Sequence, residues 1–149
     1  MKITDQQVAV LRAQLVGNRE EHLKLMRQLD PDEANTCYTT LVAAAFIAAT
    51  EDHFRKDGKV AEESEVIDFV ARMRQKDDDI AETISPEIAE SMILDILGKG
   101  TAVDADPDRM FGHQAFLLAV MVSEREFTDS ALDSFLREAR ELADGHLAN

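Results

Sequence analysis

The chain has 149 residues, 31% of them charged, and its 30 acidic side chains outnumber 16 basic ones to give a net charge of −14 at pH 7. This charge repels nucleic-acid phosphates and anionic lipid headgroups, so we expect neither direct nucleic-acid binding nor a membrane partner. The acids are spread along the chain, which is typical of a solvated surface. The length fits one domain, and we predict a single all-helical domain over residues 1–149.

Cysteine usage and the N-terminal sequence indicate the compartment. Cys37 is the only cysteine, so no internal disulfide can form. The first residues also lack a basic and apolar leader. We therefore expect an unprocessed cytoplasmic protein.

Proline and glycine number only three and six, which favours a chain made almost entirely of helices. Thr4 and Gln7 have capping-box spacing, and Ile3 is placed to pack on Val8, so a helix begins at Thr4. The apolar spacing extends through residue 29, but Gly17 interrupts it. The sequence leaves open whether residues 4–29 form one helix or two.

The longest uncharged stretch lies between Glu33 and Glu51, where seventeen residues include nine consecutive apolar ones from Leu41 to Ala49. In a chain so rich in charge, this run must be surrounded by other helices. We predict a central helix over roughly residues 32–54. Polar residues in its first third and acids at both ends argue against a membrane span.

Two amphipathic helices are predicted next. The turn formed by residues 56–59 precedes the first, whose apolar residues have helical spacing. The second begins at Ser85-Pro86, an N-cap followed by a first-turn proline, and ends at Gly98. The apolar positions of the first are Val66, Phe69, Val70 and Met73.

A second strongly apolar helix and a final amphipathic helix complete the chain. Asp106-Pro107 caps the apolar one, which contains residues 115–122, and Thr128 caps the last, with Phe127 placed to pack on Leu132. The buried face expected for the last helix consists of Leu132, Phe135, Leu136, Ala139 and Leu142.

The predicted fold is therefore all-α, a single globular bundle of five to seven helices around two apolar central helices. The order of a buried helix, a short turn and an amphipathic helix occurs twice, in residues 38–74 and 110–140. The two halves share no clear residue identity, so the sequence leaves a duplication open.

Two loops partly match calcium-binding patterns. Asp104, Asp106 and Asp108 have EF-hand spacing, but Arg109 replaces the turn glycine and Ala115 the bidentate glutamate. We expect a turn there and no metal.

The second loop surrounds Gly58, where His53 and Arg55 stand in place of the first two carboxylates. In its order of an apolar helix, Asp57-Gly58-Lys59-Val60 and then acids, this segment resembles the tellurite-resistance B-type helical domains. Four residues are too short a match to assign a family, and we expect this loop also to be a turn.

The candidate site residues are few. No histidine follows a glutamate by three residues, as a carboxylate-bridged di-metal bundle requires, so no metal or other cofactor is expected. His113 lies beside Gln114 on the polar flank of the second apolar helix. Tyr38 and Cys37 lie in the first turns of the central helix, where the helix dipole can activate a thiol.

Three functional hypotheses follow. The first is a non-enzymatic cytoplasmic protein that acts through protein contacts as an adaptor, regulator or inhibitor, with an unknown partner or a second copy of itself. The second is a ligand-binding or enzymatic domain whose site lies between the two central helices and uses His113, Tyr38 or Cys37. The third is an acidic decoy for a basic nucleic-acid-binding protein, which requires carboxylates gathered on one face.

Overall fold

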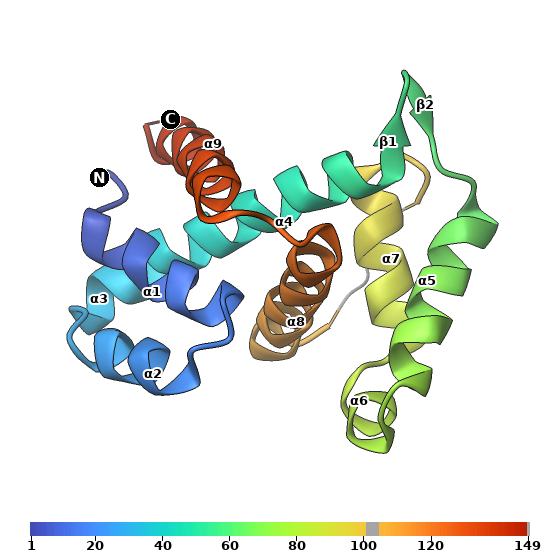
Figure 1. The fold of residues 1–149 in the computed structure, drawn as a ribbon, viewed down its shortest axis with the longest axis horizontal. Coiled ribbons are helices and arrows are strands. Elements are labelled where there is room, and N and C mark those ends of the chain that lie inside the picture. Colours follow the sequence, from blue (N-terminus) through green and yellow to red (C-terminus); the bar gives the residue numbers. More distant parts are fainter. Residues whose placement is uncertain (101–104, 149) are drawn as a thin grey trace. The chain divides into compact units, whose positions relative to one another are not determined.

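The computed structural model of the protein describes residues 1–100 and 105–148 (Figure 1). The described residues are mostly helical and include only a small two-stranded sheet, which confirms the predicted all-α fold. With residues 31–54 counted as one continuous helix, they form eight helices, one more than the expected upper limit. The additional helix is α6 (Asp78–Thr83), which the sequence pattern did not predict and which begins at the N-cap Asp77.

The chain divides into two compact units. The terminal unit consists of residues 1–48 and 121–149, and the internal unit consists of residues 49–120. The prediction of a single domain stays a prediction. Within the described ranges, no helix is both long and apolar enough to cross a membrane.

The terminal unit begins with α1 (Asp5–Leu15) and α2 (Arg19–Arg27), which are separate helices. The capping box at Thr4 is confirmed, because the Gln7 N–H donates to Thr4 Oγ1 at 3.2 Å and the Thr4 N–H donates to Gln7 Oε1 at 2.9 Å. Gly17 has a φ of +80°, a conformation that ends α1, and Asn18 caps α2. This settles the question that residues 4–29 left open.

The central helix consists of α3 (Pro31–Glu33), the π-helical segment η1 (Ala34–Tyr38) and α4 (Thr39–Phe54). Most of its apolar run is buried, as predicted. Ile47 is an exception, because 42% of its surface is exposed. The run is therefore not enclosed on every side, since Ile47 is partly open to solvent.

The last helix, α9 (Asp129–Leu147), begins at Thr128, whose hydroxyl accepts the Ala131 N–H at 3.1 Å. Leu142 was expected on its buried face, but it is 47% exposed. The reason is geometric: Ala139 and Ala143 continue the buried stripe at a spacing of four residues, and Leu142 falls at the edge of that stripe. Phe127 stacks on Phe135, with ring centroids 5.6 Å apart.

In the internal unit, α4 leads into a short antiparallel hairpin formed by β1 (Arg55–Lys56) and β2 (Lys59–Val60). Asp57 and Gly58 have φ values of +55° and +76°, the backbone of a tight hairpin turn, for which Asp-Gly is a preferred pair. The turn is as predicted. The two short strands on either side of it were not predicted, because only helices were expected.

The remaining helices of the internal unit are α5 (Glu63–Gln75), α6, α7 (Pro86–Ile96) and most of α8 (Pro107–Arg125). The buried face of α5 and the caps of α7 and α8 at Ser85 and Asp106 are as predicted. The Arg74 guanidinium joins α5 to the end of α6 by donating to the carbonyl oxygens of Ile84 at 2.9 Å and Ala81 at 2.8 Å.

Candidate functional site

His113, the first of the sequence candidates, is buried in the internal unit and has 2% exposure. Its Nε2 accepts the backbone N–H of Ser85 at 3.0 Å, and its Nδ1 lies 2.8 Å from the carbonyl oxygen of Arg109. Because a carbonyl oxygen only accepts, the ring proton is on Nδ1. The Nε2 bond therefore joins α8 to the start of α7, and the Nδ1 bond fixes the ring on α8 itself, so both nitrogens have a structural role.

Tyr38 and Cys37 are buried in the terminal unit. The Tyr38 hydroxyl donates to Gln14 Oε1 at 3.2 Å, and burial raises the pKa of this hydroxyl above its usual value. Cys37 is a free thiol. Because His113 lies in the internal unit, neither unit by itself brings the three candidates together, and the site expected between the central helices stays a prediction.

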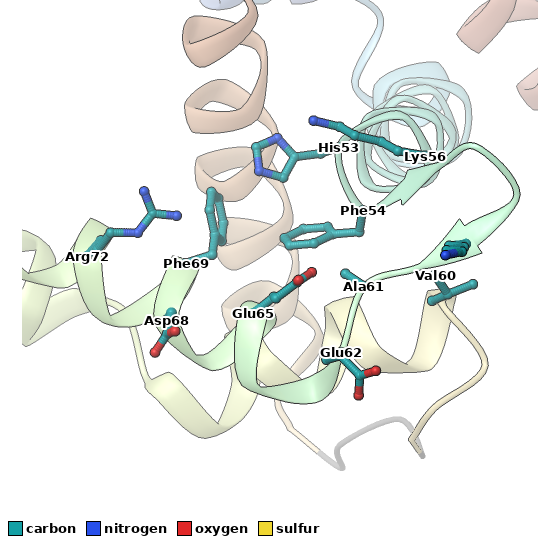
Figure 2. A pocket seen from close by; sticks show the side chains of 11 residues that line it. His53, Phe54, Lys56, Val60, Ala61, Glu62, Glu65, Asp68, Phe69 and Arg72 are labelled. Carbon is teal, nitrogen blue, oxygen red and sulfur yellow. The ribbon is translucent and has the colours of Figure 1, made fainter.

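One hollow, which we call the hairpin hollow, has a volume of about 720 Å³ and lies in the internal unit between the end of α4, the hairpin and α5 (Figure 2). The tight turn folds the chain back, and the Ala61 N–H donates to the Phe54 carbonyl oxygen at 2.8 Å. This bond fixes the direction in which the chain enters α5. The hollow is thus set by the Asp-Gly turn and by the register of its two strands.

The floor of the hairpin hollow is aromatic. The Phe54 and Phe69 rings meet edge to face at 5.4 Å and 89°, and the His53 ring lies 4.6 Å from Phe54 and 5.0 Å from Phe69. The two phenyl rings are buried and the imidazole is half-buried. Such contacts hold aromatic rings in fixed orientations, so the floor is preorganised. Val60 and Ala61, both half-buried, complete it.

The rim of the hairpin hollow carries six exposed charged residues. They are Lys56, Lys59, Glu62, Glu65, Asp68 and Arg72. In Figure 2 the side chains of His53 and Lys56 lie above the phenyl rings, Arg72 lies to the left of Phe69, and the carboxylates of Glu62, Glu65 and Asp68 lie below the rings. Among the labelled side chains the basic groups therefore lie apart from the carboxylates, and we call this arrangement the dipolar rim.

The charged rim side chains are not paired with one another. None of the six forms a side-chain hydrogen bond or ion pair with any other residue in the described ranges. The three basic and three acidic groups thus keep their charges available to a bound molecule. This balance contrasts with the net charge of −14 for the whole chain.

A second hollow, which we call the α4–α9 groove, lies in the terminal unit and has a volume of about 370 Å³. Its α4 wall consists of Thr39, Thr40, Ala43, Ala44 and Ile47. Its α9 wall consists of Leu142, Ala143 and His146. Apart from His146, these lining residues have no ionisable side chain.

Neither calcium-like loop forms a cluster of ligands among residues that the structure describes. No group of three or more His, Cys, Asp and Glu side chains there is placed to hold a metal ion. Asp104, the first residue of the EF-hand-like pattern, lies outside the described residues, so that loop is not tested. In the loop around Gly58, His53 is instead part of the aromatic floor.

Sequence reasoning missed both hollows. One signal for the hairpin hollow was present, because three of the five residues from Arg55 to Lys59 are basic in an otherwise acidic chain. The aromatic floor had no such signal, since Phe54 and Phe69 come from different helices and each reads as core. Comparisons of the chain with protein-family models, curated proteins and solved structures give no match.

Proposed function

We propose that the protein is a non-enzymatic cytoplasmic binding module that acts through protein contacts, as a small adaptor or regulator. The contact site is the hairpin hollow. The observation that carries this proposal is the combination of a preorganised aromatic floor with six charged rim side chains that have no partner of their own. An apolar centre within a polar rim is the usual anatomy of a protein interface.

The occupant is a peptide segment of a partner protein with one apolar side chain between an acidic and a basic residue. The apolar side chain contacts the Phe54 and Phe69 rings, and its removal from water contributes about 1.5–3 kcal/mol. The acidic neighbour faces Arg72 and Lys56, and the basic neighbour faces the carboxylates. Opposite charges on the two sides fix the direction in which the segment binds.

A small molecule with both an anionic and a cationic group is the second candidate occupant. The hollow volume of about 720 Å³ supports it, because small-molecule sites are about 300–1,000 Å³. The earlier expectation of a site built on His113, Tyr38 or Cys37 has weaker support. The polar atoms of His113 and the Tyr38 hydroxyl already serve hydrogen bonds within the protein.

The acidic-decoy hypothesis has less support than a contact role. Exposed carboxylates occur on α1, α2, α5, α6, α7, α8 and α9 rather than on one helix face. A cytoplasmic location is supported by the buried free thiol of Cys37, which fits a reducing compartment. A second copy of the chain is one partner to be tested, by light scattering over a range of concentrations.

Site-specific photo-crosslinking tests this proposal. The Lys59 side chain, on the exposed strand β2, is replaced by a benzophenone amino acid, and the tagged protein is irradiated in lysate of its source. The matched control carries the same group at Lys24, an exposed position on α2 in the terminal unit. We expect a defined protein adduct from position 59 alone, with the crosslinked peptide showing the apolar and oppositely charged residues described above.

The charge-reversal variants Arg72→Glu and Glu65→Lys then test the dipolar rim. Each is expected to reduce the adduct at least about tenfold, because the partner's like charge would face it. Equal adducts from positions 59 and 24, or adducts unchanged by both reversals, would contradict the proposal. If a metabolite raises the melting temperature of the wild type but not of Arg72→Glu, the occupant of the hairpin hollow is a small molecule rather than a protein segment.

A further inference from the structure

We infer that the acidic residue of the segment bound in the hairpin hollow is a phosphorylated side chain, whose phosphate group lies between Lys56 and Lys59. This inference rests on the proposed function and names the chemistry of its acidic residue. Lys56 and Lys59, which we call the lysine pair, belong to the two strands of the hairpin and both line the hollow.

The strand register places the two lysines directly opposite each other. Lys56 on β1 is the register partner of Lys59 on β2, at the positions that flank the two-residue turn. Side chains of directly opposite residues in an antiparallel pair lie on the same face, with Cβ atoms about 4.5–5.5 Å apart. The two ammonium groups can therefore approach one bound group together.

The pairing of the hairpin continues from the lysine pair to the aromatic floor. The Ala61 N–H donates to the Phe54 carbonyl oxygen at 2.8 Å, so these residues are paired two positions farther from the turn. Both of them line the hollow together with the lysine pair. In Figure 2 Lys56 lies above the phenyl rings. A segment that places an apolar side chain on the floor therefore brings a neighbouring residue to the lysine pair.

The two positive charges of the lysine pair face each other without a partner. Neither lysine forms a side-chain hydrogen bond or ion pair within the described ranges, and both side chains are exposed. Like charges directly opposite each other destabilise a strand pair. An anion bound between the two ammonium groups removes this repulsion, so the free hairpin favours binding of an anion.

The other charged residues of the hairpin leave this region positive. Arg55 forms an ion pair with Glu51 on α4. Asp57, in the turn between the lysines, is exposed and forms no ion pair in the part of the chain that the structure describes. In Figure 2 the rim carboxylates lie below the phenyl rings, on the other side from Lys56. The lysine pair therefore keeps its two charges for an occupant.

The charge of the lysine pair matches a phosphate group better than a carboxylate. A carboxylate has one negative charge, which neutralises only one of the two ammonium groups. A phosphate monoester has about −1.5 to −2 charges at pH 7 and three acceptor oxygens, so it accepts hydrogen bonds from both lysines at once. Such charge-assisted bonds are stronger than bonds between neutral groups.

The net charge of the chain favours a phosphorylated segment over free phosphate. A net charge of −14 repels a free anion at long range. A phosphorylated residue is held in addition by the apolar side chain beside it, which contacts the Phe54 and Phe69 rings. The floor and the lysine pair then act on one molecule, and binding at the first raises the local concentration of phosphate at the second.

Labelled peptides test this inference. Each peptide has Leu between Arg and a variable residue, in both orders, and the variable residue is phosphoserine, Glu or Ser. Binding is measured by fluorescence anisotropy at constant ionic strength, and NMR chemical-shift mapping locates the contact. We expect the phosphoserine peptide to bind at least about tenfold more tightly than the Glu peptide, and to shift the amides of residues 55–61.

Matched variants separate the lysine pair from surface charge in general. Lys56→Gln and Lys59→Gln are each expected to reduce the preference for phosphoserine over Glu to less than about threefold, because a single ammonium group remains. The control is Lys76→Gln, which removes the same charge from an exposed position at the end of α5, outside the lining of the hollow. We expect this control to retain the preference.

The outcomes distinguish this inference from the proposed function. Equal binding of the phosphoserine and Glu peptides, with the amides of the hollow shifted by both, would overturn the inference and leave the proposed function standing. An equal loss of preference in Lys76→Gln would also overturn it, because surface charge in general would then be the cause. The crosslinking experiment replaces Lys59 itself, so its result tests the hollow as a contact site independently of the lysine pair.

Inorganic phosphate separates the two sources of the phosphate group. It is added to the protein alone, and the melting temperature is compared with that in chloride at the same ionic strength. If phosphate raises the melting temperature of the wild type but not of Lys59→Gln, and the phosphoserine peptide binds no more tightly than the Glu peptide, the ligand is free phosphate and the inference is wrong. No shift of the hollow amides by the phosphoserine peptide would overturn it as well.

Discussion

His113 and Ser85 are joined by a buried hydrogen bond, in which the Ser85 backbone N–H at the start of α7 donates to His113 Nε2 at 3.0 Å. The other ring nitrogen is used by the Arg109 carbonyl oxygen. His113, the first of the candidate site residues, thus has a structural role in which it connects α8 to the start of α7. Whether a histidine on an apolar helix has a functional or a structural role is decided by the hydrogen-bond partners of its two ring nitrogens.

We predict that His113→Leu lowers the free energy of unfolding by about 1–3 kcal/mol, because it leaves the Ser85 N–H without an acceptor in a buried environment. Urea denaturation followed by circular dichroism measures the change. Arg109→Ala is the control, because this exposed side chain lies one turn earlier on α8, and we expect it to cost less than about 0.5 kcal/mol. Equal stability of His113→Leu and wild type would refute the supporting role.

The N-terminal segment is held to α9 at Ile3. The Ile3 carbonyl oxygen accepts from Arg140 Nη2 at 2.7 Å, and the Ile3 N–H donates to Asp144 Oδ1 at 2.7 Å. Arg140 also pairs with Asp5, a side chain that is 95% exposed. The hydrogen bond from Arg140 to the Ile3 carbonyl is partly buried, whereas the ion pair with Asp5 is at the surface. The hydrogen bond is therefore expected to contribute more to stability than the ion pair.

We therefore predict that Arg140→Met lowers the free energy of unfolding by about 1–3 kcal/mol, because it removes a charged hydrogen-bond donor from the Ile3 carbonyl. Asp5→Asn removes only the exposed ion pair and is expected to cost less than about 0.5 kcal/mol. Urea denaturation compares the two variants, and hydrogen exchange of the first amides reports on the segment itself. A larger effect for Asp5→Asn would show that the ion pair, not the backbone bond, holds the segment.

Tyr38 is the only tyrosine, so its ionisation can be followed by ultraviolet absorbance. Burial raises the pKa of its hydroxyl above the usual value of 10.0. The unfolded chain loses the proton near pH 10.0 and the folded chain retains it, so stability falls as the pH rises beyond that value. We predict that tyrosinate forms only together with loss of the helical circular dichroism signal, whereas ionisation near pH 10.0 with the helices intact would contradict this.

The pKa of Glu90 on α7 is also raised, and its effect on stability falls at a lower pH than that of Tyr38. Burial raises the pKa of its carboxyl group, and the carboxylates of Glu63 and Glu87 raise it further, against a smaller opposing effect of Arg74. Because the folded-state pKa lies above the unfolded value of 4.5, this group makes the protein less stable as the pH rises from 4.5 through the folded-state pKa.

We predict that Glu90→Gln raises the urea midpoint near neutral pH and that this gain disappears well below pH 4.5, where both forms of the chain hold the proton. The control is Glu82→Gln, because it removes the same charge from an exposed position on α6 and is expected to change the midpoint less. A gain that is independent of pH would mean that shape or helix propensity, rather than charge, is the cause.

Local signals allowed most helix boundaries to be predicted. Thr4, Ser85, Asp106 and Thr128 each cap the helix expected of them, because a cap depends only on a side chain and on backbone groups two or three residues away. The question at Gly17 stayed open, because a glycine within an apolar pattern is compatible with either a break or a continuous helix. In the structure Gly17 has a φ of +80°, which ends α1, so the segment forms two helices.

The candidate sites could not be predicted in the same way. Phe54 and Phe69 meet because a tight turn returns the chain, and Ile47 and Leu142 line one groove although they are far apart in the sequence. Each of these residues fits an apolar helix face by itself, so its pattern does not distinguish a covered position from an exposed one. The error at Leu142 arose from this ambiguity at the edge of an apolar stripe.

The sequence alone determined the all-α class, the helix starts at Thr4, Ser85, Asp106 and Thr128, and the Asp-Gly turn, since these depend on interactions within a few residues. Tertiary structure decided which apolar residues stay exposed and which charges around the aromatic floor remain unpaired. It also decided that both nitrogens of His113 are used in hydrogen bonds within the protein. The physical reason is that burial and pairing depend on segments distant in the chain. Only their packing brings those segments within reach of one another.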